Sequence, residues 1–270
     1  METSKKMLNL GCGDRYHPEW TNVDFVSKPP HVMAHNIRLD LPFGNETFYA
    51  VYHSHVLEHF STTDGESLIR ECFRVLRSEG ILRVVVPDLE NIIRTYLEQL
   101  EKAIGGNKSA ESNYDWILVE LFDQVARNES GGEMAKYLMQ EQIPNAGFVV
   151  DRIGNNYFEL IRRNYGSATA ARQRNLLGSA RRFLSALLKR NKHFRYHRIG
   201  RFREGGDVHY HMYDRFSLGR LLLRCGFVDV QRKTAFESSV ENWTTYGLDA
   251  KDGSVHAPLS LFMEARKPTA

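Results

Sequence analysis

Near its start the sequence has an apolar run that ends in two glycines. Residues 7–10 read Met-Leu-Asn-Leu, and Gly11 and Gly13 follow with one residue between them. An apolar strand that leads into a Gly-x-Gly turn brings bare backbone close to a ligand, because glycine has no Cβ to hold that ligand away. We therefore expect a flat or phosphate-like ligand at this turn.

Two features distinguish the turn from the dinucleotide-binding fingerprint. Its third glycine is missing, and Arg15 and Tyr16 stand where close helix packing needs a small residue. Asp24 ends a second expected strand, as a ribose-binding carboxylate should, but only ten residues separate it from Gly13. The helix that usually joins these two strands must therefore be reduced to a turn or a short helical piece.

Strand and helix patterns alternate in the rest of the first ninety residues. The run Ile81–Val86 is nearly all apolar and β-branched, which is typical of a strand buried on both faces of a parallel sheet. A helix is expected from about Asp64, its expected cap, to Gly80. This alternation predicts an α/β doubly wound sheet, with a ligand beyond the carboxyl ends of the strands. Further strands are expected at 31–35, 48–53, 227–231 and 259–265.

The alternation disappears between residues 91 and 204. Helical patterning covers 89–100, 113–127, 133–142 and 157–164 instead. We expect a helical insertion there, placed after the fifth strand. Residues 1–90 and 205–270 then form one sheet domain.

Five motifs stand in an order that resembles the class I S-adenosylmethionine-dependent methyltransferase family. The chain is most similar to the branch with a shortened first helix, often found among polysaccharide and surface-glycan biosynthesis proteins. The resemblance implies a Rossmann-like, mostly parallel sheet with an antiparallel last strand, S-adenosylmethionine as cofactor, and the insertion as a lid over the substrate site. The motifs are Leu8–Gly13, Asn22–Asp24, Leu41–Phe48, Val56–His59 and Phe73–Gly80.

The resemblance also implies which residues surround the cofactor. Asp24 would accept hydrogen bonds from the ribose diol, and the alternative is an acid that makes a turn contact. Cys12 is expected to be a small buried residue rather than a reactive thiol. The cofactor-binding candidates are Asn9, Gly11, Cys12, Gly13, Asp24, Phe25, Asn36, Ile37 and His53.

Methyl transfer from a sulfonium requires mainly that the reactants be held in line, and a hydroxyl acceptor benefits from a general base. The catalytic candidates are the polar side chains where an acceptor would approach: His55, His59, Asp88, His209 and His211. Structural hydrogen bonding and loop anchoring are the alternatives for each of them. His55 and His59 are four residues apart, but no third ligand of an obvious kind is adjacent, so we predict no metal.

Positive charge is concentrated in one segment. The chain carries 36 Lys and Arg against 33 Asp and Glu, a net charge of +3, but residues 162–203 contain Lys and Arg and no acid. Residues 176–190 within it have the pattern of a cationic amphipathic helix. It could lie on an anionic membrane surface, bind a phosphate-bearing substrate, or pack on the acidic remainder of the chain. Nucleic acid is less favoured, because no nucleic-acid module is visible.

Composition indicates a reduced, cytoplasmic protein. The three cysteines show no C-x-x-C spacing, the amino-terminal residues lack the apolar region of a signal peptide, and no stretch approaches a membrane span. Peripheral contact with the inner membrane face stays open, as does the oligomeric state. We predict O-methylation of a sugar or glycan intermediate, phosphate- or lipid-linked. The alternatives are a methyltransferase for a small metabolite or natural product, and a cofactor-binding partner protein without catalysis.

Overall fold

The computed structural model describes residues 5–174 and 192–269. The chain forms two compact units, one made of residues 1–91 and 210–270, and the other of residues 92–209. The predicted amphipathic helix at 176–190 lies outside the described residues. No described helix is long and apolar enough to cross a membrane.

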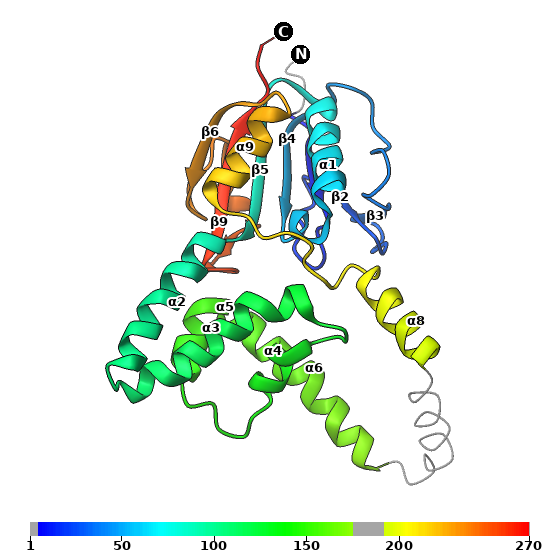
Figure 1. Ribbon diagram of the computed structural model, residues 1–270. Coiled ribbons are helices and arrows are strands. Elements are labelled where there is room, and N and C mark those ends of the chain that lie inside the picture. Colours follow the sequence, from blue (N-terminus) through cyan, green and yellow to red (C-terminus); the bar gives the residue numbers. More distant parts are fainter. Residues whose placement is uncertain (1–4, 175–191, 270) are drawn as a thin grey trace. The chain divides into compact units, whose positions relative to one another are not determined.

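The first unit contains a seven-stranded sheet in the order β3-β2-β1-β4-β5-β9-β6 (Figure 1). Strands β1 to β5 are parallel, and β9 is antiparallel to both of its neighbours. This confirms the predicted mostly parallel, Rossmann-like sheet with an antiparallel last strand. The strands are β1 (Met7–Leu10), β2 (Thr21–Asp24), β3 (Val32–Ala34), β4 (Phe48–Ser54), β5 (Leu76–Pro87), β6 (Val228–Lys233) and β9 (Ser260–Arg266).

The strand order reverses between β1 and β4, so the crevice at their carboxyl ends is the expected ligand site. Turns rather than a helix join β1 to β2, as predicted from the short spacing between Gly13 and Asp24. A 3-10 helix, η1 (Leu57–His59), follows β4 directly. The residues that the sequence singled out around Gly11 and His55 therefore lie at the carboxyl edge of two neighbouring strands.

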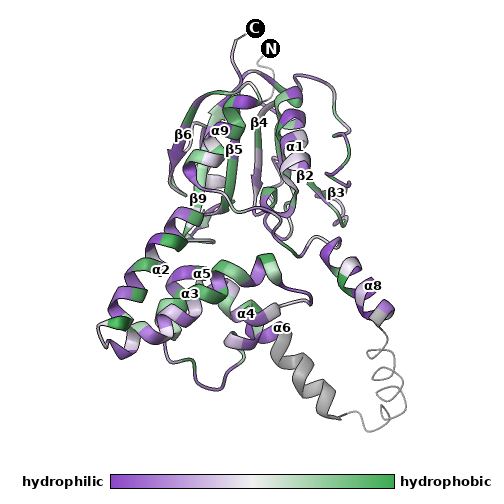
Figure 2. Ribbon diagram, viewed as in Figure 1, coloured by the Kyte–Doolittle hydropathy of each residue, from purple (hydrophilic) through white to green (hydrophobic). Residues whose placement is uncertain are grey.

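Helices α1 (Thr62–Val75) and α9 (Arg215–Arg224) cover one face of the sheet (Figure 1). The prediction of Asp64 as the cap of α1 was wrong, because Ser61 is the N-cap and accepts the Asp64 N–H. The helix also ends earlier than expected, since Leu76 already pairs with Phe48 as the first residue of β5. The apolar stripe of α1 packs on the strands, which are apolar themselves (Figure 2).

The opposite face is covered by the segment between β6 and β9. It includes a 3-10 helix, η3 (Trp243–Tyr246), and the short hairpin β7 (Ala250–Lys251) and β8 (Ser254–Val255). Arg83 of β5 is fully buried beneath it and pairs with Asp249 at 2.6 Å and Glu264 at 2.7 Å. Its guanidinium also donates to two backbone carbonyls, so the buried charge is compensated.

The second unit is helical in its described part. The expected helix at 133–142 ends already at Leu138, and the helix at 146–153 was not predicted. Trp116 is fully buried in the unit, and Arg152 Nη2 donates to Glu120 Oε1 at 2.8 Å. The helices are α2 (Leu89–Ile104), which begins in the first unit, and α3 (Lys108–Ala126), α4 (Gly132–Leu138), α5 (Ala146–Ile153), α6 (Asn155–Arg174) and α8 (Lys192–Arg203).

Candidate functional site

The glycine turn after β1 has a conformation that favours glycine at both positions. Gly11 has φ +63° and Gly13 has φ +55°, in the left-handed region. A Cβ on Gly11 would lie 2.4 Å from Val56 Cγ2, whereas a Cβ on Gly13 would meet nothing within 4 Å. Gly11 is thus required for packing, and Gly13 leaves open space beside the backbone.

The Asp24 carboxylate closes this turn. Its Oδ2 accepts the Gly13 N–H at 2.7 Å, so the acid at the end of β2 and the turn after β1 lie together as the sequence predicted. Lys28, which sequence reasoning missed, donates from Nζ to the Gly13 carbonyl at 2.7 Å and pairs with Asp14 at 2.6 Å. The backbone of Gly13 is therefore bound by the Asp24 carboxylate at its N–H and by the Lys28 ammonium at its carbonyl.

Asn9, just before the turn, and Cys12, within it, are both buried. Asn9 is buried, and its Nδ2 donates to the Arg15 carbonyl and to Asn22 Oδ1 at 3.0 and 3.1 Å. Burial, with the nearby Asp24 carboxylate, raises the pKa of the Cys12 thiol to about 11. A thiol with this pKa stays protonated at neutral pH, so Cys12 is a small buried residue here.

Three further cofactor candidates follow β2 and β3. The Phe25 side chain is 75% exposed beside Asp24, an unusual position for a large aromatic ring. Asn36 Oδ1 accepts the Arg38 N–H at 3.1 Å, and Ile37 packs partly against the core. Phe25 thus offers an open ring face, while the Asn36 carbonyl already serves a local turn.

His53 is the last buried side chain of β4. Its imidazole is fully buried, and burial lowers its pKa to about 4, although the Glu58 carboxylate acts in the opposite direction. Neither ring nitrogen has a hydrogen-bond partner among the described residues. His53 is therefore neutral and lies under the site rather than at its surface.

His55 is the best-positioned proton acceptor of the predicted group. It follows β4 with φ +54°, and its N–H donates to the Val85 carbonyl at 2.9 Å. Its Nδ1 lies 3.3 Å from Glu58 Oε1, and its Nε2 lies 3.0 Å from Ser260 Oγ. A carboxylate, an imidazole and a hydroxyl thus lie in one chain of polar contacts.

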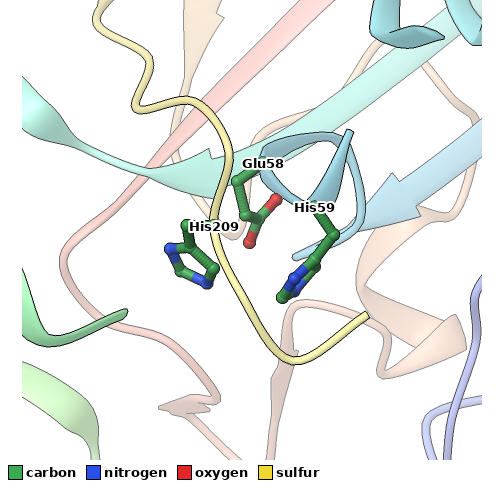
Figure 3. A group of neighbouring side chains, drawn as sticks. All are labelled: Glu58, His59 and His209. Atoms are coloured by element: carbon green, nitrogen blue, oxygen red, sulfur yellow. The ribbon is translucent and has the colours of Figure 1, made fainter. Parts of the chain in front are cut away.

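Glu58 and His59 project from η1 (Figure 3). Glu58 is fully buried, and its backbone carbonyl accepts the N–H groups of Tyr210 and His211 at 2.8 and 3.3 Å. The His59 carbonyl accepts from Arg38 at 3.3 Å. The segment that returns to the first unit at Tyr210 is therefore fixed to the same short helix that carries Glu58.

The other catalytic candidates are anchored groups. Asp88 is buried, caps α2 by accepting the Asn91 N–H at 3.2 Å, and pairs with Arg232 at 3.3 Å. His211 stacks edge-on against Tyr213 with ring centroids 4.4 Å apart, and burial lowers its pKa. His209 belongs to the second unit, where its N–H donates to the Gln124 carbonyl.

Comparison with known proteins gives a match to one family model and to several solved structures. Residues 19–84 match the family model described as a methyltransferase domain. Among solved structures, a SAM-dependent methyltransferase from Archaeoglobus fulgidus is 10% identical with a TM-score of 0.40, over 98% of this chain and 87% of that one. The CMeT domain of the citrinin polyketide synthase is also 10% identical, with a TM-score of 0.41, over 98% of this chain and 47% of that one. No curated protein matches the sequence.

The groups exposed at the glycine turn are of the kinds that the cofactor of such a domain needs. The open backbone at Gly13, the Asp24 carboxylate and the exposed Phe25 ring offer contacts for an amino-acid tail, a ribose diol and a purine. The match to a methyltransferase domain over residues 19–84 implies S-adenosylmethionine as the cofactor.

Proposed function

We propose that this protein transfers a methyl group from S-adenosylmethionine to a hydroxyl of a sugar or glycan intermediate. The proposal of a hydroxyl acceptor rests on the chain of contacts Glu58–His55–Ser260, which lies beside the glycine turn. The sugar rests on the resemblance of the glycine, Asp24 and Glu58-His59 motifs to the glycan-biosynthesis branch.

The proposed cofactor site is the glycine turn after β1. Gly11, Gly13 and Asp24 would hold it, and Phe25 would cover its purine. When bound, S-adenosylmethionine supplies a methyl group already activated on a sulfonium. The protein therefore has to orient the acceptor oxygen and remove its proton.

The contacts of His55 define which nitrogen can act as the base. His55 Nδ1 lies 3.3 Å from the Glu58 carboxylate, which can only accept hydrogen bonds, so this contact favours a proton on Nδ1. In the proposed tautomer Nε2 is the acceptor, and the Ser260 hydroxyl, 3.0 Å away, would donate to it. An acceptor hydroxyl that takes the place of the Ser260 hydroxyl would give its proton to Nε2.

Glu58 is the positioning residue in this arrangement. Its buried carboxylate fixes the tautomer of His55 and stabilises the imidazolium that forms when Nε2 takes the proton. In this role the Ser260 hydroxyl contacts His55 Nε2 when no acceptor is bound, and the acceptor hydroxyl would replace it there. Its removal should therefore leave the base intact, whereas removal of the Glu58 charge should weaken it.

Turnover with a panel of sugar and glycan acceptors tests the proposal. We expect His55→Ala to lower kcat roughly a hundredfold, while the Kd for the demethylated cofactor changes less than twofold. Glu58→Gln should lower kcat, because the imidazolium that forms on proton transfer loses its anionic partner. Ser260→Ala should keep kcat within a few-fold. His193→Ala, on α8, is the matched control and should match the parent protein.

The outcomes separate the proposal from its alternatives. Cofactor binding with full turnover in His55→Ala would mean catalysis by positioning alone. Turnover only on small metabolites would support the metabolite enzyme. Cofactor binding with no turnover on any acceptor would favour the partner protein.

A further inference from the structure

The second unit contains a pocket that is lined by residues of this unit alone. It has a volume of about 520 Å³ and lies among residues of α3, α4 and α8 and the segment between α3 and α4. Its apolar lining includes Leu118, Val119 and Phe122, and the Phe122 side chain is 59% exposed. Arg203 holds α8 to the end of α3, by donating to the carbonyls of Val125 and Arg127 at 3.3 Å each.

The lining carries charges of both signs, three carboxylates and three guanidinium groups. Three carboxylates line the pocket, and each has a cation close by: Asp123 pairs with Arg127 at 2.6 Å, and Glu129 and Glu133 lie 3.5 and 2.6 Å from Lys136.

Arg195 and Arg198 also line the pocket, one helical turn apart on α8. Both side chains are exposed, and neither has an ion-pair partner among the described residues. Two exposed guanidinium groups therefore stand beside an apolar wall.

Arg127 gives a second, independent sign of a ligand. Its side chain is only 8% exposed, and Nη2 is used by Asp123. Its Nε is buried and has no hydrogen-bond partner among the described residues. A buried donor without a partner costs about 1–3 kcal/mol, and an acceptor from a bound ligand would remove that cost.

We propose that this pocket binds an amphiphilic phosphate, with the phosphate at Arg195 and Arg198 and the apolar chain along Leu118, Val119 and Phe122. Guanidinium groups match the oxygens of a phosphate in pairs, and the apolar wall requires a hydrophobic partner. The same chemistry is present in a free lipid phosphate and in an anionic lipid headgroup. The proposal concerns binding and does not depend on methyl transfer.

Calorimetry with the full chain tests the ligand class with four soluble probes: octyl phosphate, octanol, inorganic phosphate and octyltrimethylammonium. We expect octyl phosphate to bind at least tenfold more tightly than each of the others. Vesicles of phosphatidic acid and of phosphatidylcholine separate the two sources. Binding to octyl phosphate alone indicates a free lipid phosphate, and additional binding to phosphatidic acid vesicles indicates a headgroup.

Paired variants locate the site. Arg195→Glu and Arg198→Glu should each weaken octyl phosphate binding more than tenfold, while Arg201→Glu, the same charge change on α8 outside the lining, should weaken it less than threefold. Phe122→Ser should weaken binding, and Leu97→Ser, also on an exposed apolar residue of this unit, should not. Circular dichroism checks that each variant is folded. Equal binding of octanol, or equal losses in the Arg198 and Arg201 variants, would overturn the proposal.

Discussion

Replacement of each glycine in the turn by alanine should have a different consequence. Both have positive φ, which costs an alanine roughly 1–2 kcal/mol. At Gly11 the new Cβ would also lie 2.4 Å from Val56 Cγ2, and such overpacking costs roughly 1–3 kcal/mol. At Gly13 the Cβ enters open space. We expect Gly11→Ala to lower the free energy of unfolding by about 3 kcal/mol and Gly13→Ala by about 1 kcal/mol.

The affinity for the cofactor should show the reverse order. The methyl group at position 13 would occupy the space that the proposed site gives to the cofactor, so Gly13→Ala should raise the Kd of the demethylated cofactor more than tenfold. Urea unfolding and calorimetry measure the two effects. In the double variant Gly11→Ala/Val56→Ala, the steric part should disappear as a coupling energy of at least 1 kcal/mol. Equal losses of stability at both glycines, with no coupling to Val56, would refute this reasoning.

Two further variants test the site and its support. Asp24→Ala should raise the Kd of the demethylated cofactor more than tenfold, because a ribose diol would lose a charged acceptor, and calorimetry with a folded variant would show it. His53 should make the fold sensitive to acid. Burial lowers its pKa from 6.5 to about 4, so between these values the unfolded chain binds a proton that the folded chain excludes. Its contribution to the free energy of unfolding is complete above pH 6.5 and falls by roughly 3 kcal/mol toward pH 4. A His53→Gln variant should lack this part of the pH dependence. Urea unfolding between pH 4 and pH 6.5 measures it. If the free energy of unfolding changed equally with pH in both proteins, the prediction would be wrong.

The sheet could be predicted because its information is local. Apolar runs and the acid after β2 are visible in short windows, and the family resemblance supplies the strand order. The ends of α1 were wrong because helix limits depend on capping and on what the next residues pair with. Leu76 fits the apolar stripe of the helix, yet its pairing with Phe48 in the sheet decides its structure.

The polar partners within the sheet unit could not be predicted because they are distant in the sequence. Ser260 meets His55 only through the pairing of β9 with β5, and no local pattern distinguishes this serine. Arg83 interrupts an apolar run, which signals a buried charge, but its partner Asp249 lies in the segment that covers the other face. Lys28 was missed for the same reason, because its Nζ contacts the carbonyl of Gly13, which lies 15 residues earlier in the sequence.

The backbone of His55 gives a final test of whether its position serves function. Six described non-glycine residues have φ between 52° and 63°; five are exposed acidic or asparagine residues, and His55 alone is partly buried. The surroundings hold it there at a cost of about 1–3 kcal/mol, and such strain is concentrated at functional sites.

Glycine relieves this strain and alanine does not, so His55→Gly should be more stable than His55→Ala by about 1 kcal/mol, the reverse of the order in ordinary helix or strand interiors. Both variants should lose turnover alike, because both lack the imidazole that faces Glu58 and Ser260. Urea unfolding measures the difference. An alanine variant at least as stable as the glycine variant would show that the φ of +54° is not strained, and the backbone argument for His55 would then have no basis.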